Sequence, residues 1–284
     1  MISCIIGSKD RLTKLKKLMP SLYSNYKSIG AEPDIIVIDG GSRADVIRYL
    51  VSCPGVTLLR EGMLHGVTRA YNRGFRLAKY PYVTWFSDDV ELTPNLFKLA
   101  VENFKQLGAN DVLSISMNNN DGQGWHVYRD ITPVGFCTKK LMTRVDFWSE
   151  DYITYASDLD FCLKAMSAGG KMQKNPELRI NHYMNSADEL HKQNSSANAD
   201  TNRYRKVWGI VTPGRDTDHI SKRVYPNVFV NAQNKSELIH KVQRVWREIS
   251  WCNIYVEDYQ GLDYLASMNV IANPGMKDSC TVVL

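Results

Sequence analysis

The sequence lacks the apolar run that a membrane-spanning helix requires. A span takes about 20 consecutive apolar residues, and no stretch of the 284 residues approaches that length. The chain opens on a short apolar segment, without the basic region that precedes the apolar part of a secretory signal. We therefore expect a cytoplasmic protein whose contact with a membrane is at most peripheral.

Paired cysteines and dense basic stretches are also missing. The six cysteines are scattered and form no Cys-x-x-Cys pair, which favours buried free thiols in a reducing compartment. The formal net charge of +5 is spread along the chain, so we expect no nucleic-acid partner. A mild positive charge suits a cleft for an anion such as a diphosphate. We interpret the densest basic stretch, Lys14–Lys17, as the solvated face of a helix.

No Gly-x-Gly-x-x-Gly sequence, internal repeat or low-complexity tract is present. The missing glycine motif disfavours a hydride-transfer enzyme that binds a dinucleotide. What is present is an ordinary globular composition, with 44% hydrophobic and 23% charged residues. This length suits one large α/β domain, alone or with an appendage.

The first part of the chain alternates strand and helix patterns. Short apolar runs predict strands at 2–6, 35–38, 56–59, 82–86 and 112–117, and helical spacing predicts helices at 12–26, 45–51, 68–79 and 93–107. Thr68 and Thr93 are expected to cap the last two helices. The alternation predicts an open, mostly parallel sheet with helices on both faces. Ligands of such sheets bind beyond the carboxyl ends of the strands, here at 7–11, 39–42 and 87–90.

The later chain is less regular. We expect a helix at 157–168 that ends at two glycines, a strand at 178–182 and a polar loop at 185–202. Beyond residue 209 the sequence suggests a strand at 228–230 and an amphipathic helix at 236–249. We divide the chain into a domain of residues 1–209 and an α-rich C-terminal extension of residues 210–284.

Two adjacent carboxylates, Asp88 and Asp89, directly follow the predicted strand 82–86 and Ser87. Buried unpaired charges are costly, and oxygen ligands at a strand end can hold Mg²⁺ or Mn²⁺, which in turn binds substrate phosphates. The alternative is an ordinary turn, because Asp is common in turns. The spacing alone leaves both open.

Other polar residues stand at strand ends and helix starts. Asp39, before Gly40, could accept hydrogen bonds from a base or ribose, or could simply form an Asp-Gly turn. His182 ends a strand and could bind a metal or phosphate, or be structural. Arg69 and Asn72 lie near a helix N-terminus, which attracts anions, or they form a solvated face.

The start of the helix at 157–168 offers a candidate base. Ser157 and Asp160 match a capping box, a hydroxyl with a carboxylate three residues later. If Asp160 turns back to cap the helix, Asp158 is left to face a cleft as a general base. The alternative is an exposed Asp158 that favours the helix dipole.

Together these segments resemble the family 2 glycosyltransferases of the GT-A fold. The resemblance covers residues 1–209. It is carried by the first strand and loop Cys4–Arg11, the segments 37–42 and 66–74, Ser87-Asp88-Asp89, the helix at 157–170, His182 and the stretch 206–209. Three positions depart from the family pattern. Ser87 replaces a first Asp, Lys9 replaces an aromatic residue that stacks on the base, and Ser157 replaces a Glu.

The resemblance implies a metal-dependent, inverting transfer of a sugar from a nucleotide-diphosphate sugar to an acceptor hydroxyl. The acceptor would be a glycan, a lipid-linked sugar or a protein-linked sugar, held by variable loops at 118–128 and 185–202. The donor would be bound by Ser8, Lys9, Asp10, Arg11, Asp39, Gly40, Arg69, Asn72, Ser87 and Asp88. Asp89 and His182 would hold Mn²⁺ or Mg²⁺, and Asp158 would deprotonate the acceptor.

Two other functions stay open at this point. A nucleotidyltransferase shares an α/β nucleotide site with paired carboxylates, but it would be expected to carry a longer glycine-rich loop than 7–11. A non-catalytic GT-A-like module that binds carbohydrate or protein is the second alternative, since the helix at 236–249 could dock on a partner.

Overall fold

The computed structural model describes residues 1–119, 125–126, 131–183, 196–208, 227–231, 253–257 and 281–283. The chain forms two compact units, Met1–Asp200 and Thr201–Leu284. None of the helices in the described ranges combines the length and apolar composition needed to cross a membrane.

The first half of the larger unit alternates strands and helices, as the sequence predicts. Its elements are β1 (Ile2–Ser8), α1 (Leu12–Ser28), β2 (Ile35–Asp39), α2 (Ala44–Ser52), β3 (Val56–Arg60), α3 (Val67–Leu77) and β4 (Tyr82–Ser87). Branched apolar residues fill β2, and all five of its residues are buried. Strands buried on both faces are typical of a parallel sheet covered by helices.

The second half adds strands of both directions. Its elements are β5 (Val90–Leu92), α4 (Leu96–Phe104), β6 (Val112–Asn118), β7 (Trp125–His126), β8 (Gly135–Thr138), α5 (Lys139–Arg144), α6 (Ser157–Ser167) and β9 (Met172–His182), and the helix α8 (Ala197–Trp208) begins in this unit and ends in the smaller one. The nine strands run in the order β3-β2-β1-β4-β8-β6-β9-β5, with β7 paired to β6. The portion β3-β2-β1-β4 is parallel, whereas β8 and β5 pair antiparallel to their neighbours.

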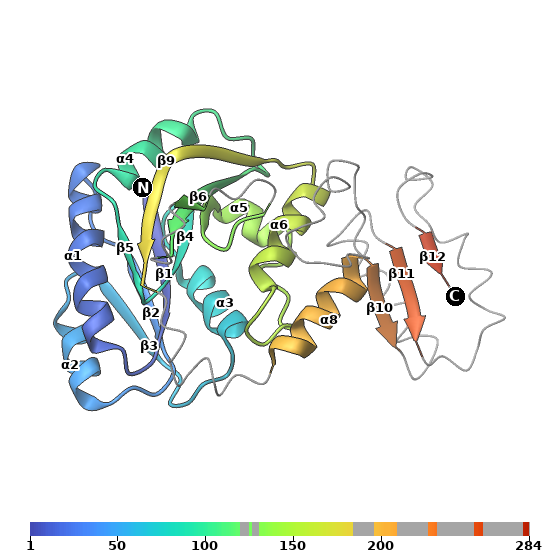
Figure 1. Ribbon diagram of the computed structural model, residues 1–284, viewed down its shortest axis with the longest axis horizontal. Helices are drawn as coiled ribbons and strands as arrows, with labels where there is room; N and C mark the ends of the chain where they lie inside the picture. Colours follow the sequence, from blue (N-terminus) through green and yellow to red (C-terminus); the bar gives the residue numbers. More distant parts are fainter. Residues whose placement is uncertain are drawn as a thin grey trace. The chain divides into compact units, whose positions relative to one another are not determined.

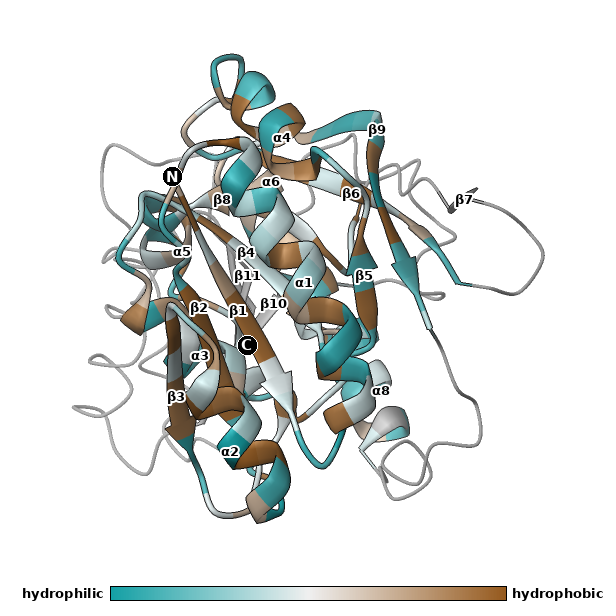
Figure 2. Cartoon of the chain, turned by 90° about the vertical axis from the view of Figure 1, so that its left-hand side faces the viewer, coloured by the Kyte–Doolittle hydropathy of each residue, from teal (hydrophilic) through white to brown (hydrophobic). Residues whose placement is uncertain are grey.

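Helices cover both faces of this sheet, as predicted. In Figure 1, α1, α2 and α4 lie on one side of the strands, and α3, α5 and α6 lie on the other. Figure 2 shows the apolar residues, in brown, along β1 and β2 between these helix layers. The α3 and α6 side holds a cluster of edge-to-face and tilted aromatic rings made by Tyr71, Phe75, Trp85, Trp148 and Phe161. The four cysteines in the described residues are free thiols, three of them buried.

The strand β5 lies at the end of the sheet and is covered by α1. The backbone N–H of Leu92 donates to Oγ of Ser21 at 3.1 Å. The side chain of Asn25 donates to the carbonyl of Thr93 at 3.1 Å and accepts the N–H of Phe97 at 3.0 Å. Two polar side chains of α1 therefore satisfy the backbone of β5 and of the turn that follows it.

Three helix starts differ from the prediction. The residue that precedes α3 is Gly66, with φ of +99°, so Thr68 is a buried helical residue and not the cap. The α4 helix begins after Asn95, and the hydroxyl of Thr93 donates instead to the carbonyl of Arg179. The α6 helix follows Ala156, which is left-handed and has no capping side chain.

The capping box expected at Ser157 and Asp160 is therefore wrong. Ser157 is the first residue of α6 and is buried, so its hydroxyl does not cap the helix from outside. Oδ1 of Asp160 lies 3.4 Å from the hydroxyl of Tyr152, which faces the helix from the preceding loop. The end of α6 follows the prediction, with Gly169 at φ of +82°.

The smaller unit contains a parallel sheet of three described strands, β10 (Asn227–Asn231), β11 (Asn253–Glu257) and β12 (Thr281–Val283). The strand expected at 228–230 is confirmed. The helix expected at 236–249 lies outside the described residues, as do most of the loops at 118–128 and 185–202. The end of the second loop is helical, because α8 begins at Ala197.

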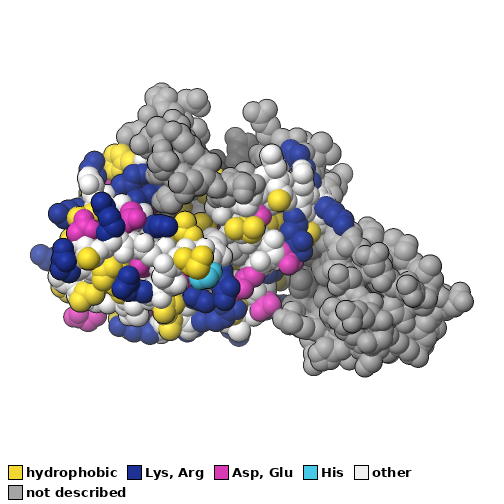
Figure 3. All heavy atoms as spheres, turned by 90° about the horizontal axis from the view of Figure 1, so that it is seen from below, with side chains coloured by type: hydrophobic (Ala, Val, Ile, Leu, Met, Phe, Trp, Pro, Cys, Tyr) yellow, Lys and Arg dark blue, Asp and Glu magenta, His cyan; other side chains and the backbone are white. Residues whose placement is uncertain are grey.

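The described surface is unevenly charged. On the face seen from below in Figure 3, Lys and Arg side chains, in dark blue, outnumber Asp and Glu side chains, in magenta. The excess agrees with the net charge of +5. A positive surface raises the local concentration of anionic ligands.

Candidate active site

The carboxyl ends of the parallel strands bring the predicted loops together. In the sheet register, Ser8 of β1 pairs with Asp39 of β2, and Gly7 pairs with Ser87 of β4. The loops 7–11, 39–42 and 87–90 therefore meet at one edge of the sheet, as expected from the alternation of strands and helices.

Asp88 is buried at this edge and held by two donors. The hydroxyl of Ser8 donates to Oδ2 of Asp88 at 2.7 Å, and a guanidinium nitrogen of Arg11 lies 2.8 Å from Oδ1. Burial raises the pKa of Asp88 to about 6, although the charge of Arg11 and the bond from Ser8 act in the opposite direction. The carboxylate is thus partly neutralised by a residue of the first loop.

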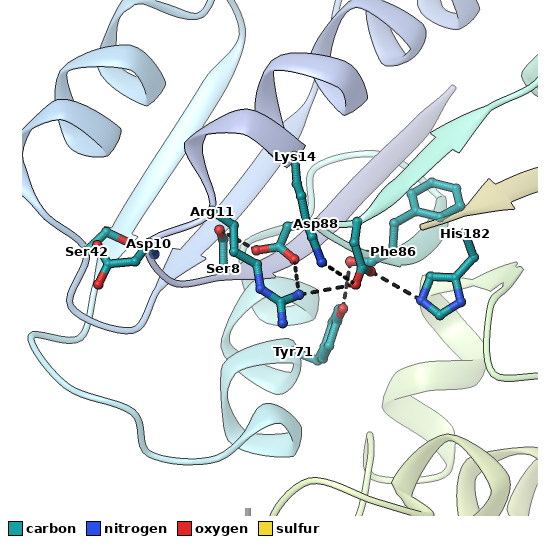
Figure 4. Close-up of polar contacts among 10 residues, drawn as sticks. Ser8, Asp10, Arg11, Lys14, Ser42, Tyr71, Phe86, Asp88 and His182 are labelled. Atoms are coloured by element: carbon teal, nitrogen blue, oxygen red, sulfur yellow. Dashed lines mark hydrogen bonds and ion pairs between the residues drawn. The ribbon is translucent and has the colours of Figure 1, made fainter. Parts of the chain in front are cut away.

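Asp89 is surrounded by two cationic side chains and a histidine. The same Arg11 nitrogen and Nζ of Lys14 each lie 3.2 Å from its Oδ2, and Nε2 of His182 lies 3.3 Å from its Oδ1. Burial alone would raise the pKa of Asp89, but the side chains of His182 and Ser87 and the ammonium of Lys14 bring it well below its usual value. Figure 4 shows Arg11, Lys14 and His182 converging on the acidic pair.

Lys14 faces the acidic pair and not the solvent. The stretch Lys14–Lys17 was expected to face solvent, and Lys16 and Lys17 do so. Lys14 lies on the first turn of α1, next to the carboxyl ends of the strands, and its side chain reaches Asp89. When a helix starts next to the carboxyl ends of the strands, the side chains of its first turn lie near that edge. This holds even where the stretch is rich in basic residues.

His182 reaches the site through strand pairing. The antiparallel ladder of β5 and β9 places Val90 opposite His182, and the N–H of Tyr183 donates to the carbonyl of Asp89 at 2.8 Å. Nδ1 of His182 lies 3.0 Å from Oδ1 of Asn119. An amide oxygen only accepts hydrogen bonds, so Nδ1 carries the proton and Nε2 is directed at Asp89.

The first two loops are tied to each other. The N–H of Asp10, at φ of +55°, donates to Oγ of Ser42 at 2.8 Å, and its carboxylate accepts the N–H of Arg43 at 2.8 Å. Asp39 is fully buried and accepts the N–H groups of Gly41 and Ser42.

The contacts of Asp39 are therefore those of an Asp-Gly turn, one of the two interpretations that the sequence left open. Gly40 donates its N–H to the carbonyl of Ser8 at 3.0 Å, and a Cβ on Gly40 would meet the side chain of Leu64. Lys9 is half-buried in the first loop. Gly40 is thus joined through Ser8 to Asp88.

Some side chains of α3 lie at the site, and others lie in the core. Tyr71 donates its hydroxyl to the carbonyl of Phe86 at 2.6 Å, next to the acidic pair. Arg69 is exposed at the start of the helix. Asn72 is buried, and its amide donates to the carbonyl of Trp148 at 2.8 Å and accepts the N–H of the same residue at 3.0 Å. The structure thus commits the Asn72 side chain to the fold, away from the acidic pair.

Asp158 shares its surroundings with the acidic pair. It is half-buried in the first turn of α6, where its Oδ1 accepts the N–H of Leu159 at 2.9 Å. Burial raises its pKa to about 6, against the opposing effect of backbone hydrogen bonds. Burial raises the pKa of Tyr71, and the negative charges of Asp88, Asp89 and Asp158 raise it further.

The residues around Asp89 fit a divalent cation together with a phosphate ligand. Oδ1 of Asp89 is buried and meets no hydrogen-bond donor of good geometry in the described part of the chain. Nε2 of His182 is held next to it with its lone pair or second proton directed at the carboxylate. No group of three or more His, Cys, Asp or Glu ligands forms among the described residues. Mg²⁺ commonly takes one or two carboxylates and completes its shell with water and substrate phosphates.

Solved structures with the same fold bind nucleotide sugars. S. aureus TarS 1-349 in complex with UDP-GlcNAc matches with a TM-score of 0.62 and 15% identity, over 77% of this chain and 70% of that one. Mannosyltransferase PcManGT from Pyrobaculum calidifontis, in complex with GDP-Man and Mn²⁺, matches with a TM-score of 0.54 and 13% identity, over 67% of this chain and 59% of that one. Another structure of TarS 1-349 is covered over 60% of its length.

These likenesses, at such low identity, establish the GT-A fold. No curated protein matches the chain. The model of the family described as "Glycosyl transferase family 2" matches residues 3–159, more than half of the chain, and this range includes the first-loop residues, both members of the acidic pair and Asp158. The chain therefore belongs to glycosyl transferase family 2.

Proposed function

We propose that this protein is a metal-dependent, inverting glycosyltransferase that moves a sugar from a nucleotide-diphosphate sugar to an acceptor hydroxyl. The observation that carries the proposal is the convergence of Arg11, Lys14 and His182 on the acidic pair at the carboxyl edge of the sheet. Asp158, a half-buried carboxylate on the separate helix α6, is the base in this proposal.

The donor is bound on the β1-β2-β4 side of the site. The loop from Ser8 to Arg11, with Asp39 and Gly40, faces the nucleoside. Arg11 and Lys14, which neutralise the acidic pair in the free protein, are placed to contact the diphosphate. Arg69 adds a cation at the start of α3, where the helix N-terminus favours anions. The related structures with UDP-GlcNAc and GDP-Man support a donor of this class.

Asp89 and His182 would hold Mn²⁺ or Mg²⁺. When bound, the cation supplies a Lewis acid that neutralises charge on the departing nucleotide diphosphate. Asp158 accepts the proton of the acceptor hydroxyl as that oxygen attacks the anomeric carbon from the face opposite the leaving group, which inverts the configuration. A base of this kind contributes about 10²–10⁴-fold to the rate. The raised pKa of Asp158 brings it closer to the pH at which a base is effective.

The test begins with the donor. Nucleoside diphosphates are screened by thermal shift with and without Mn²⁺, and the nucleotide sugars of the best base are then assayed for transfer and hydrolysis. A ligand at about 100 times its Kd adds ~2.7 kcal/mol to the free energy of unfolding.

Asp158→Asn should then lower kcat by about 10²–10⁴-fold, with Asp151→Asn as the matched control, because Asp151 is an exposed carboxylate of the preceding loop. If Asp158→Asn retains full turnover, the assignment of the base is wrong. A wild-type protein that binds nucleotides but turns over no donor would favour a non-catalytic binding module.

A further inference from the structure

Asp200 is a buried carboxylate that the proposed chemistry does not use. It lies in the first turn of α8 with only 2% of its surface exposed. Oδ1 accepts the N–H of Ile153 at 3.0 Å, and Oδ2 accepts the N–H groups of Thr154 and Tyr155, each at 2.9 Å. The hydroxyl of Ser196 also donates to Oδ2, at 3.0 Å.

Three successive backbone N–H groups converging on one anion form a nest, a concavity that backbones use to bind anions. Here the anion is part of the same chain. Burial would raise the pKa of Asp200, but the hydrogen bonds from Tyr155, Ile153, Thr154 and Ser196 lower it below its usual value. Asp200 is therefore ionised at neutral pH, and its contacts are charge-assisted hydrogen bonds, which are stronger than neutral ones.

The segment that Asp200 holds leads directly into the proposed base. Residues 153–155 are followed by Ala156, which is left-handed at φ of +63°, and then by Ser157 and Asp158 at the start of α6. No side chain caps this helix from its own N-terminal residue. The orientation of the first turn of α6 thus depends on the hydrogen bonds that fix the segment before it.

The same segment also contacts the start of α3. The carbonyl of Ile153 accepts the N–H of Thr68 at 3.3 Å. Gly66 approaches so closely that a Cβ there would lie 2.7 Å from that carbonyl oxygen. The segment held by Asp200 is therefore packed between the helix that carries Asp158 and the helix that carries Arg69 and Tyr71.

We propose that Asp200 is a positioning residue for sugar transfer, which fixes residues 153–156 and thereby places Asp158 opposite the acidic pair. The inference rests on the proposed function, because it takes Asp158 as the base. Asp200 does not touch the substrate and acts only through the backbone of this segment. Displacement of a reacting group by about 1 Å costs on the order of 10²-fold in rate, so loss of this anchor should affect kcat more than donor binding.

The test uses Asp200→Asn in the full chain. The amide keeps the size of the side chain but loses the charge and one acceptor atom. We expect kcat to fall by about 10–100-fold, with the Kd for the donor nucleotide changed less than about twofold, and the acid limb of the kcat–pH profile to move because the surroundings of Asp158 change. Amide hydrogen exchange of residues 153–155 should also become faster than in the wild type.

Asp111→Asn is the matched control. Asp111 is also buried and also holds a loop, accepting the N–H groups of Gly108 and Lys171 at 2.9 and 2.8 Å, and Lys171 follows the C-terminal end of α6, the end remote from Asp158. Both variants are expected to lower the Tm, but only Asp200→Asn should change kcat and its pH profile, measured well below either Tm.

An active wild type in which Asp200→Asn keeps its kcat and pH profile overturns the positioning role and leaves the proposed function intact. Equal losses of kcat in the two variants overturn it as well, because they would report general destabilisation. A wild type that transfers no sugar, or an Asp158→Asn variant with full turnover, overturns the proposed function and the inference that depends on it.

Discussion

The Nε2 atom of His182 lies 3.3 Å from Oδ1 of Asp89, although one residue ends β9 and the other follows β4. Strand β5 is only three residues long. It directly follows Asp89 and pairs antiparallel with the end of β9, so it brings the two residues close together. With Nδ1 bonded to Asn119, Nε2 is directed at Asp89, and Nε2 and Oδ1 of Asp89 are the two atoms that we propose as metal ligands.

His182→Ala should weaken Mn²⁺ binding in the presence of the nucleoside diphosphate, because it removes one ligand of this pair. We expect a loss of affinity of about 10–100-fold, the size seen when metal-site partners are removed. Titration of Mn²⁺ by electron paramagnetic resonance measures the effect. His65→Ala, at an exposed histidine, is the control, and equal Mn²⁺ affinity in the two variants would contradict the metal site.

The rate of transfer should depend on pH through the raised pKa of Asp158, about 6. A base acts in its ionised form, so kcat at saturating donor should fall as the pH decreases through about 6 and be level above about 7. Asp88 titrates in the same range, so the Kd of the nucleotide is measured over the same pH values to separate binding from turnover. A profile that stays level down to pH 4.5 would exclude Asp158 as the titrating base.

Asp158→Asn should stabilise the fold at pH 7.5 while it removes activity. The folded-state pKa lies above the ordinary value of 3.8, so the ionised carboxylate destabilises the fold above about pH 6, and this cost disappears as the pH falls below 3.8. Removing a cost of about 1 kcal/mol raises the Tm by roughly 2–4 °C in a protein of this size. Differential scanning fluorimetry at pH 7.5 and 4.5 should show a smaller gain at the lower pH, and a decrease of Tm at both values would oppose the prediction.

Gly66→Ala should destabilise the protein more than Gly62→Ala. Both glycines have positive φ, +99° and +76°, so both substitutions place alanine in a backbone region that costs about 1–2 kcal/mol. A Cβ at Gly62 meets open space, whereas a Cβ at Gly66 would lie 2.7 Å from the carbonyl oxygen of Ile153. Urea denaturation measures the two free energies of unfolding, and equal losses would mean that the contact between the α3 start and Ile153 relaxes at no cost.

The parallel half of the fold follows from sequence patterns, because β1, β2 and β3 are short, mainly apolar runs, each followed by a segment of helical spacing. The meeting of Ser8, Asp39 and Asp88 at one edge follows from the same rule. Strand β5 could not be predicted, since three residues are too few to show a period.

The residues whose roles the sequence did not reveal are brought to their partners by tertiary structure. Lys14 belongs to a basic stretch, and its composition predicts exposure to solvent. Only the orientation of α1 against the sheet brings Lys14 to Asp89. Asp200 lies in a polar, apolar-poor stretch, and its function depends on N–H groups of a distant loop. The start of α6 follows Ala156 in a left-handed conformation, which no residue preference of alanine indicates.

The hydrogen bonds from α1 to β5 also bear on self-association. An end strand normally presents unpaired N–H and C=O groups that can template pairing with another chain. Here Oγ of Ser21 occupies the N–H of Leu92, and the side chain of Asn25 occupies the carbonyl of Thr93. The end strand beside the acidic pair therefore offers fewer free backbone groups to which another chain could add a strand.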